Sequence, residues 1–275
     1  MAKGRRITGM ENMPHVGVGG WSFEPWCGVF YPKGLRHADE LAFASRALTS
    51  LEINATYHKL QTPQSFAAWA AATPEDFVFS IKASRFCTNR KVLAQAGEAI
   101  TRFFDQGLVA LGPRLGPILW QFMPTKTFDP DDFARFLDLL PPRWGGAALR
   151  HCVEPRHESF QDPRFAALCA ERGVAVCLSD HDEHPLIAAA SPFVYARLMR
   201  LEEACDTGYP RAALAAWASR LEALAGADRD LFVYFIGSGG EGKVRAPAAA
   251  RALLAQLGVE RAPPVDLPRR KSVKL

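Results

Sequence analysis

Eight short apolar runs, spread along the chain and separated by longer amphipathic stretches, constrain the fold more than any other feature of this sequence. Runs that are apolar throughout are typical of strands buried on both faces, as in a parallel sheet that helices cover. The runs are Val16–Gly19, Leu48–Ile53, Phe77–Lys82, Ile118–Phe122, Leu149–Val153, Val174–Ser179, Phe193–Arg197 and Leu231–Phe235. We therefore expect eight parallel strands.

Between these runs, apolar residues recur at three- and four-residue steps, which indicates amphipathic helices. Thr62-Pro63 and Asp129-Pro130 each place a capping side chain before a proline at the first helical position. After the sixth run, Pro185–Ala190 leaves room for only a turn or two of helix. The predicted helices are Asp39–Leu48, Pro63–Ala72, Gln95–Gln106, Asp129–Leu140, Pro163–Gly173, Ala212–Ala225 and a last helix that begins at Ala246-Pro247.

Alternating strands and helices of this number predict a single α/β domain, a (β/α)8 TIM barrel that is irregular around its sixth helix. A chain of 275 residues has the usual length for such a barrel. A doubly wound open sheet is the structural alternative. We expect the barrel to span residues 15–262, between a flexible N-terminal segment at 1–14 and a basic C-terminal tail at 263–275.

Composition excludes some partners and compartments. The net charge is only +4, and the basic residues are partly gathered in the two tails, which gives little reason to expect nucleic acid as a partner. No apolar stretch approaches the roughly 20 residues that a membrane-spanning helix needs. The six cysteines form no Cys-x-x-Cys pair, so we expect reduced thiols in a soluble, cytoplasmic protein. The sequence does not indicate an oligomeric state.

Polar residues able to do chemistry stand at or just after the ends of seven of the eight runs. In a (β/α)8 barrel the active site is built from such positions, because all strands open on the same face. This pattern predicts where chemistry takes place but not which reaction. The residues are Trp21 and Ser22, Glu52 and Asn54, Lys82, Gln121, Glu154 with Arg156 and His157, Asp180, and Arg197.

Glu52 and Asn54 end the second run two residues apart, so their side chains point to the same side of the strand. Because Ile53 suits the helix layer better, we expect both polar side chains to point into the barrel mouth. A buried carboxylate needs a partner. Lys82 on the neighbouring strand is the candidate, either as a structural ion-pair partner or as part of an acid/base pair.

The richest cluster follows the fifth run. Glu154 is a candidate acid or base, and the guanidinium of Arg156 is suited to a substrate carboxylate or phosphate. Asp180 on the next strand could converge with Glu154 and His157. Together with Glu52, these residues could hold a divalent metal, although Lys82, Arg156 and Arg197 would repel it. We expect no cofactor, and keep the metal site as an alternative.

Two glycine-rich segments have possible binding roles. In Gly237–Lys243 the spacing resembles a phosphate loop, but Val244 replaces the hydroxyl residue that would hold magnesium. The loop could still bind phosphate through its backbone and Lys243, or be a surface connection. Gly19-Gly20-Trp21-Ser22 could let a substrate approach the backbone, with Trp21 as a wall or as ordinary packing.

Several of these segments together resemble a known family. The segments are Gly19-Gly20-Trp21-Ser22, Glu52-Ile53-Asn54-Ala55-Thr56-Tyr57, Phe79-Ser80-Ile81-Lys82, Leu115-Gly116-Pro117-Ile118-Leu119-Trp120-Gln121, Glu154-Pro155-Arg156-His157, Asp180 and Tyr195-Ala196-Arg197. In this order, from about Val16 to Leu257, they resemble the "domain of unknown function 72" family, also called YecE-like. The resemblance implies a TIM barrel and a bacterial, cytoplasmic protein whose family has no established activity.

The chain departs from that family at positions expected around the barrel mouth. His58 stands where an aromatic is usual, and Asn89 where a histidine is. Met199-Arg200 replaces His-Gly, and Ile236-Gly237 replaces a pair of asparagines. The departures at Asn89, Met199 and Ile236 are the reason to keep a non-catalytic binding barrel as an alternative.

The mixed charges of the predicted mouth lead to a functional hypothesis: a hydrolase, lyase or isomerase acting on an anionic small molecule. Glu52 or Glu154 would be the general acid or base, with Asp180 as its electrostatic partner. Lys82, Arg156 and Arg197 would stabilise charge and bind the anion, and Trp21, Ser22, Asn54, Gln121, His157 and Lys243 would contact substrate. The alternatives are a non-catalytic ligand-binding or regulatory barrel and a metal-dependent hydrolase.

Overall fold

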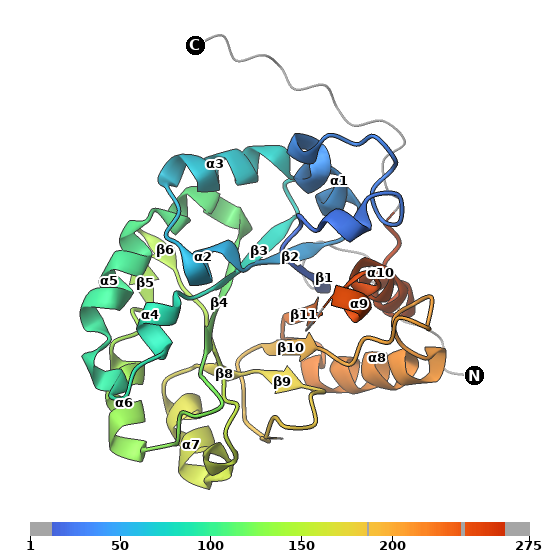
Figure 1. Ribbon diagram of the computed structural model, residues 1–275. Coiled ribbons are helices and arrows are strands. Elements are labelled where there is room, and N and C mark those ends of the chain that lie inside the picture. Colours follow the sequence, from blue (N-terminus) through green and yellow to red (C-terminus); the bar gives the residue numbers. More distant parts are fainter. Residues whose placement is uncertain (1–12, 186, 238–239, 262–275) are drawn as a thin grey trace.

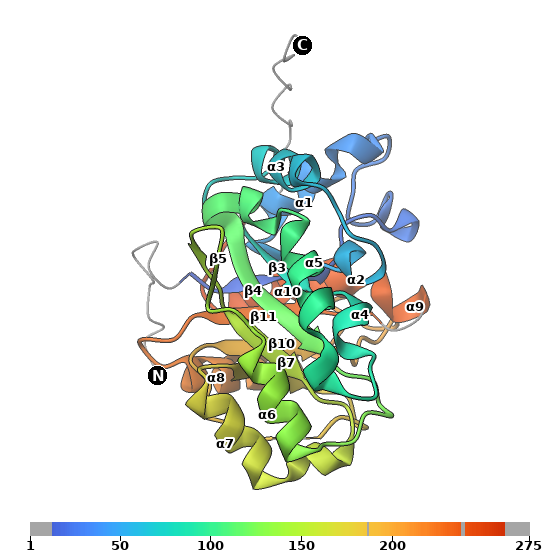
Figure 2. The same cartoon turned by 90° about the vertical axis from the view of Figure 1, so that its left-hand side faces the viewer.

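The computed structural model describes residues 13–185, 187–237 and 240–261 (Figure 1). Nine strands form one sheet in the order β8-β7-β4-β3-β2-β1-β11-β10-β9, and every neighbouring pair is parallel. Helices lie around the outside of the strands (Figure 1), and Figure 2 shows α6 and α7 on this outer side. The predicted α/β barrel is confirmed.

The strands coincide with the apolar runs, each within a few residues. The sheet consists of β1 (His15–Gly19), β2 (Ser50–Ile53), β3 (Val78–Lys82), β4 (Leu115–Gln121), β7 (His151–Glu154), β8 (Ala175–Val176), β9 (Leu178–Ser179), β10 (Val194–Leu198) and β11 (Leu231–Phe235). A separate antiparallel hairpin pairs β5 (Arg143–Trp144) with β6 (Ala147–Ala148).

The sixth strand of the barrel is divided at Cys177, which explains why nine strands arise from eight runs. Its first half, β8, pairs with β7, and its second half, β9, pairs with β10. The amide of Cys177 still donates to the carbonyl of Val153 in β7, at 2.9 Å. The chain thus changes partner within one strand, and this change joins the two ends of the sheet.

The helices begin and end close to the predicted positions, because their sequence signals act locally. Thr62 accepts a hydrogen bond from the amide of Ser65, and Asp129 accepts two, from the amides of Asp131 and Asp132. The longer helices are α1 (Glu40–Ala47), α3 (Pro63–Ala72), α5 (Gly97–Asp105), α6 (Pro130–Asp138), α7 (Pro163–Glu171), α8 (Arg211–Ala225) and α10 (Ala246–Gln256). Short helical turns are α2 (Ala55–His58), α4 (Arg85–Thr88), α9 (Gly240–Lys243), η1 (Glu24–Trp26), η2 (His37–Asp39), η3 (Leu93–Gln95), η4 (Leu108–Arg114) and η5 (Glu158–Gln161).

The sixth barrel helix is the main irregularity. Between Asp180 and Ser191, the described residues form turns and irregular chain but no helix. The irregularity expected there is present, but the turn or two of helix expected within Pro185–Ala190 is not seen in the described part of that segment. A loop therefore stands where the sixth barrel helix would pack, whereas α7 contacts β8.

The core has two parts because side chains alternate along each strand. In β10, Val194, Ala196 and Leu198 belong to the large cluster between the sheet and the helices, whereas Tyr195 belongs to the smaller cluster inside the barrel. Leu119, Cys152, Phe232 and Tyr234 share that interior, among others. The interior is thus packed, and the polar ends of the same strands lie above it.

One glycine fixes the spacing of two strands. A Cβ atom built on Gly17 of β1 would lie 1.8 Å from the carbonyl oxygen of Ser50 in β2. Only glycine allows this approach, because any side chain would collide with the neighbouring backbone.

The predicted segment boundaries fall largely beyond what the structure describes. Residues 1–12 of the expected N-terminal segment and the whole expected tail at 263–275 lie outside the described residues. The domain limits at 15 and 262 stay predictions. Within the described part of the chain, no helix is both long and apolar enough to cross a membrane.

Candidate active site

Arg197 occupies the centre of the barrel mouth and bridges two carboxylates from distant strands. Its side chain comes from the C-terminal part of β10 and is 2% exposed. Nη1 donates to Glu154 Oε2 at 2.6 Å, while Nε and Nη2 donate to the two oxygens of Glu52 at 3.2 and 3.1 Å. The planar guanidinium suits this arrangement, because its fork of donors can satisfy two acceptors in fixed directions.

Glu52 points into the barrel, as the alternation of β2 predicts, and is fully buried. Besides Arg197, its Oε2 accepts a hydrogen bond from the hydroxyl of Tyr195, at 2.7 Å. Burial and the charge of Glu52 raise the pKa of Tyr195 far above its usual value, so the phenol stays a donor. Lys82 was the expected ion-pair partner, but the structure assigns that place to Arg197, whose fork reaches both oxygens across the barrel.

Glu154, at the end of β7, has three partners. Besides Arg197, Gln121 Nε2 donates to its Oε2 at 2.7 Å, and Arg156 donates to its Oε1 through Nε at 3.3 Å and Nη2 at 3.1 Å. Burial alone would raise the pKa of this carboxyl, but Arg197, Arg156 and the Gln121 amide outweigh it and lower the pKa to about 2. Glu154 is therefore an ionised carboxylate at neutral pH.

Lys82 ends β3 and carries its ammonium over the ring of Tyr57, with 4.2 Å from Nζ to the ring centre. Burial and the nearby Arg197 lower its pKa from 10.5 to about 8, against the opposing effect of Glu52 and Glu154. With its ordinary pKa, the amine of Lys82 would be charged at all physiological pH. With a pKa of about 8, about a tenth of the Lys82 amines are neutral at pH 7.

The mouth thus combines three cationic side chains with two carboxylates. Arg197 is saturated by Glu52 and Glu154 and is too buried to bind a substrate directly. Arg156 is 23% exposed, and Lys82 is half-buried. These two cations are therefore the groups of the cluster that can meet an incoming anion.

Asp180 and His157 were expected to converge with Glu154, but each has another partner. Asp180 accepts hydrogen bonds from the amide of Met199, at 2.6 Å, and from the hydroxyl of Tyr209. His157 precedes η5 and accepts a hydrogen bond from the amide of Ser159 through Nδ1. Both residues therefore act locally to shape loops, and any role in catalysis stays a prediction.

The alternative metal site finds no support in the geometry. Among the described residues, no group of three or more His, Cys, Asp or Glu side chains is arranged to hold a metal ion. Glu52 and Glu154 are separated by the guanidinium of Arg197, which occupies the position between the two carboxylates.

Trp21 and Ser22 follow the first strand and Asn54 the second, and in the described part of the chain none of the three is hydrogen-bonded to the charged cluster. Ser22 donates to Glu40 Oε2 at 2.8 Å, and the ring of Trp21 packs edge-on against Trp69. Asn54 is the N-cap residue before α2, and its Oδ1 is buried with no hydrogen-bond partner among the described residues.

The loop at Gly237–Lys243, which was expected to bind phosphate, contacts the segment after β1 through Lys243. The ammonium of Lys243 lies 4.4 Å from the centre of the Phe23 ring, and its carbonyl accepts a hydrogen bond from Trp26 Nε1. Gly239 of this loop lies outside the described residues. A role of Lys243 in binding phosphate stays a prediction.

Sequence reasoning missed three residues of the site. Tyr195 lies two residues before Arg197 on the same strand, so the period of two could have placed it inside the barrel. Tyr57, whose ring lies under the ammonium of Lys82, has no role in the site predicted from the sequence above. His184 bonds to the hydroxyl of Ser179 at 2.9 Å, and burial lowers its pKa to about 4. The sequence contained no signal for this contact, since it depends on the path of an irregular loop.

Comparisons with known proteins agree on the fold. A family model described as "Protein of unknown function DUF72" matches residues 15–272. A DUF72 family protein from Thermotoga maritima is 22% identical, with a TM-score of 0.67 over 88% of this chain and 97% of that one. One from Enterococcus faecalis is 17% identical, with a TM-score of 0.68 over 94% of this chain and 99% of that one. No match was found among curated proteins.

A more distant likeness extends outside that family. The structure of SacUVDE is 10% identical, with a TM-score of 0.53 over 89% of this chain and 99% of that one. At these identities, such likenesses show a shared barrel fold and no shared chemistry.

Proposed function

Because the chain belongs to the DUF72 family of proteins of unknown function, its activity has to be argued from the site, and we propose a lyase or isomerase that acts on an anionic small molecule. Lys82 is the group that takes a proton from the substrate and returns it. Arg156 contacts the anionic group of the substrate. Glu52, Glu154 and Arg197 hold the mouth in place.

The observation that supports this proposal most is the environment of Lys82. Its amine lies at the end of a barrel strand, above the ring of Tyr57 and beside a second cation, with its pKa lowered to about 8. A general base works best when its pKa is close to the working pH, because it is then both available and basic. The pKa of Lys82 therefore fits proton transfer near neutrality.

The carboxylates of Glu52 and Glu154 fit a positioning role better than an acid/base role. With a pKa of about 2, Glu154 is too weak a base to take a proton from carbon and too acidic to be a proton donor at neutral pH. Its hydrogen bonds orient Arg156 and Gln121, and its charge offsets Arg197. We therefore assign the acid/base role, expected for Glu52 or Glu154 from the sequence, to Lys82.

The proposed step is a proton transfer with no net redox change. The neutral amine of Lys82 removes a proton from a carbon beside the carbonyl of the substrate, and the electron pair moves onto that carbonyl oxygen. In an isomerase, the substrate carries a hydroxyl on the same carbon; its proton moves to the enolate oxygen while the ammonium returns the proton to the former carbonyl carbon, so the carbonyl moves by one carbon. In a lyase, the electron pair instead breaks the bond from the next carbon to a leaving group, which takes the proton from the ammonium. Arg156 offsets the negative charge that the substrate carries throughout.

The test is turnover of phosphorylated and carboxylated metabolites, followed by exchange of substrate hydrogen for deuterium in heavy water. We expect Lys82→Met to lower the turnover and the exchange by about 10²- to 10⁴-fold, since general base catalysis contributes that much. In the unsubstituted protein, turnover should rise with pH through about 8, as the amine of Lys82 loses its proton.

Lys33→Met is the matched control, because it removes an exposed lysine and should leave turnover unchanged. Full activity of Lys82→Met would overturn the proposal. Binding of an anion without any turnover or exchange would instead favour the non-catalytic barrel, which the departures at Asn89, Met199 and Ile236 suggest.

A further inference from the structure

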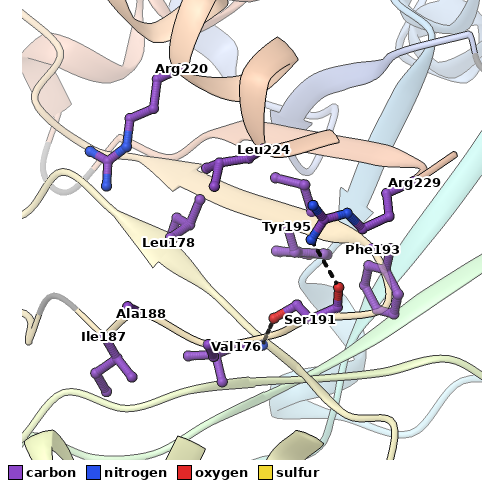
Figure 3. A pocket seen from close by; sticks show the side chains of 12 residues that line it. Val176, Leu178, Ile187, Ala188, Ser191, Phe193, Tyr195, Arg220, Leu224 and Arg229 are labelled. Carbon is purple, nitrogen blue, oxygen red and sulfur yellow. Dashed lines mark hydrogen bonds between the residues drawn. The ribbon is translucent and has the colours of Figure 1, made fainter. Parts of the chain in front are cut away.

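A cavity of about 340 Å³ lies on the outer side of the barrel, away from the charged mouth (Figure 3). One wall is the outer face of β8 and β9, which contributes Val176 and Leu178, and another is α8, which contributes Leu224. The loop after the sixth strand, with Ile187 and Ser191, forms a third. The cavity exists because a loop stands in the position of the sixth barrel helix.

The inner surface of this cavity is mainly apolar, but two arginines stand beside it. Figure 3 shows Arg220 and Arg229 on two sides, with Leu178 and Leu224 drawn between them. Arg220 comes from α8 one turn before Leu224, on the same helix face. Arg229 comes from the connection between α8 and β11.

Neither guanidinium is neutralised by the described residues. Arg229 Nη1 donates to the carbonyl of Ser191 at 3.4 Å, and Arg220 lies over the ring of Trp217, 5.0 Å from the guanidinium carbon to the ring centre. No carboxylate oxygen in the described part of the chain lies within 4.0 Å of either. The two guanidinium groups therefore place two positive charges beside an apolar cavity.

The size of the cavity fits a small ligand. Its volume of about 340 Å³ lies at the lower end of the range for sites that bind small molecules.

We propose that this cavity is a second binding site, distinct from the barrel mouth, that takes an amphipathic carboxylate with a short hydrocarbon chain. The hydrocarbon chain contacts Val176, Leu178 and Leu224. The carboxylate binds at the rim of the cavity, to one of the two guanidinium groups, which can donate two hydrogen bonds to it. The proposal does not depend on the reaction at Lys82.

Titration calorimetry with octanoate tests the proposal, with octanol and butyrate as companion probes. Octanoate should bind to one site, whereas octanol lacks the charge and butyrate lacks most of the apolar surface, so both should bind at least tenfold more weakly. Arg220→Gln combined with Arg229→Gln should weaken octanoate binding by at least tenfold. Arg211→Gln, on the same helix but outside the cavity lining, should leave it unchanged.

The position of the site is tested separately by Leu224→Trp, which fills the cavity with a larger side chain and should abolish octanoate binding. Circular dichroism shows whether each variant is folded. Failure of octanoate to bind the unsubstituted protein would overturn the proposal. If octanol binds as tightly as octanoate, the arginines do not contribute to binding and the proposal is wrong. If Leu224→Trp binds octanoate as tightly as the unsubstituted protein, the ligand does not occupy this cavity and the proposal is also wrong.

Discussion

Glu154 is a buried carboxylate that depends on its partners for its charge, so Glu154→Gln should change both the stability and its pH dependence. At neutral pH the substitution leaves Arg197 with only one carboxylate, and we expect a loss of about 3 kcal/mol in the free energy of unfolding. Urea denaturation measures this. Glu98→Gln, which removes an exposed partner of Arg102 on α5, should cost far less.

The acid range gives the second readout for the same variant. The pKa of Glu154 is lowered in the folded state from 4.5 to about 2, so its stabilising contribution is complete above pH 4.5 and is lost as the pH falls towards 2. The unsubstituted protein should lose up to about 3 kcal/mol over this range from this group. If Glu154→Gln shows the same acid dependence, the charge of Glu154 does not contribute in this way.

The sequence predicted which side chains enter the mouth better than it predicted how they pair. Glu52, Lys82, Glu154 and Arg197 were all placed there, because the period of two along a strand decides which face a side chain occupies. Their partners depend on distances across the barrel, which no local pattern contains. For that reason Lys82 was predicted to pair with Glu52, and the Arg197 bridge was not foreseen.

At the scale of elements, the contact between β1 and β2 depends on Gly17. Gly17→Ala should destabilise the protein severely, because the added methyl group would overlap the carbonyl of Ser50 and force the two strands apart. Gly97→Ala is the control at the start of α5, where the new methyl group would meet only Leu139, at an ordinary 3.7 Å. Thermal denaturation should show a large loss for the first variant and a slight gain for the second.

The elements were predictable where their signals are local. The capping residues Thr62 and Asp129 marked helix starts that the structure confirms, since a cap acts on the next few amides. The loop that replaces the sixth helix could be anticipated only as an irregularity. Its path and the cavity behind it depend on packing against α8, which the sequence pattern does not describe.

At the scale of the whole molecule, the reactivity of the buried cysteines measures how fast the protein unfolds. Cys27 is exposed and Cys205 is partly exposed, whereas Cys87, Cys152, Cys169 and Cys177 are buried. Burial also raises the pKa of Cys87 and Cys169 to about 12, so few of their thiols are ionised and reactive. The double variant Cys27→Ser, Cys205→Ser should therefore react with Ellman's reagent only as fast as the protein unfolds.

The measurement is the rate of thiol modification with increasing denaturant. Rapid reaction of the double variant without denaturant would mean that part of the barrel opens far more readily than the rest. The position of the reacting cysteine would then identify the weak region, since Cys177 lies in the divided strand and Cys87 in the turn after β3.

The change of partner at Cys177 has a consequence for aggregation. A closed barrel has no free strand edge, but here the closure consists of β8 and β9, strands of two residues each. If this strand detaches, β7 and β10 both become edge strands, with unpaired backbone donors and acceptors. Intermolecular pairing on heating should therefore start at these two edges, on either side of the divided strand.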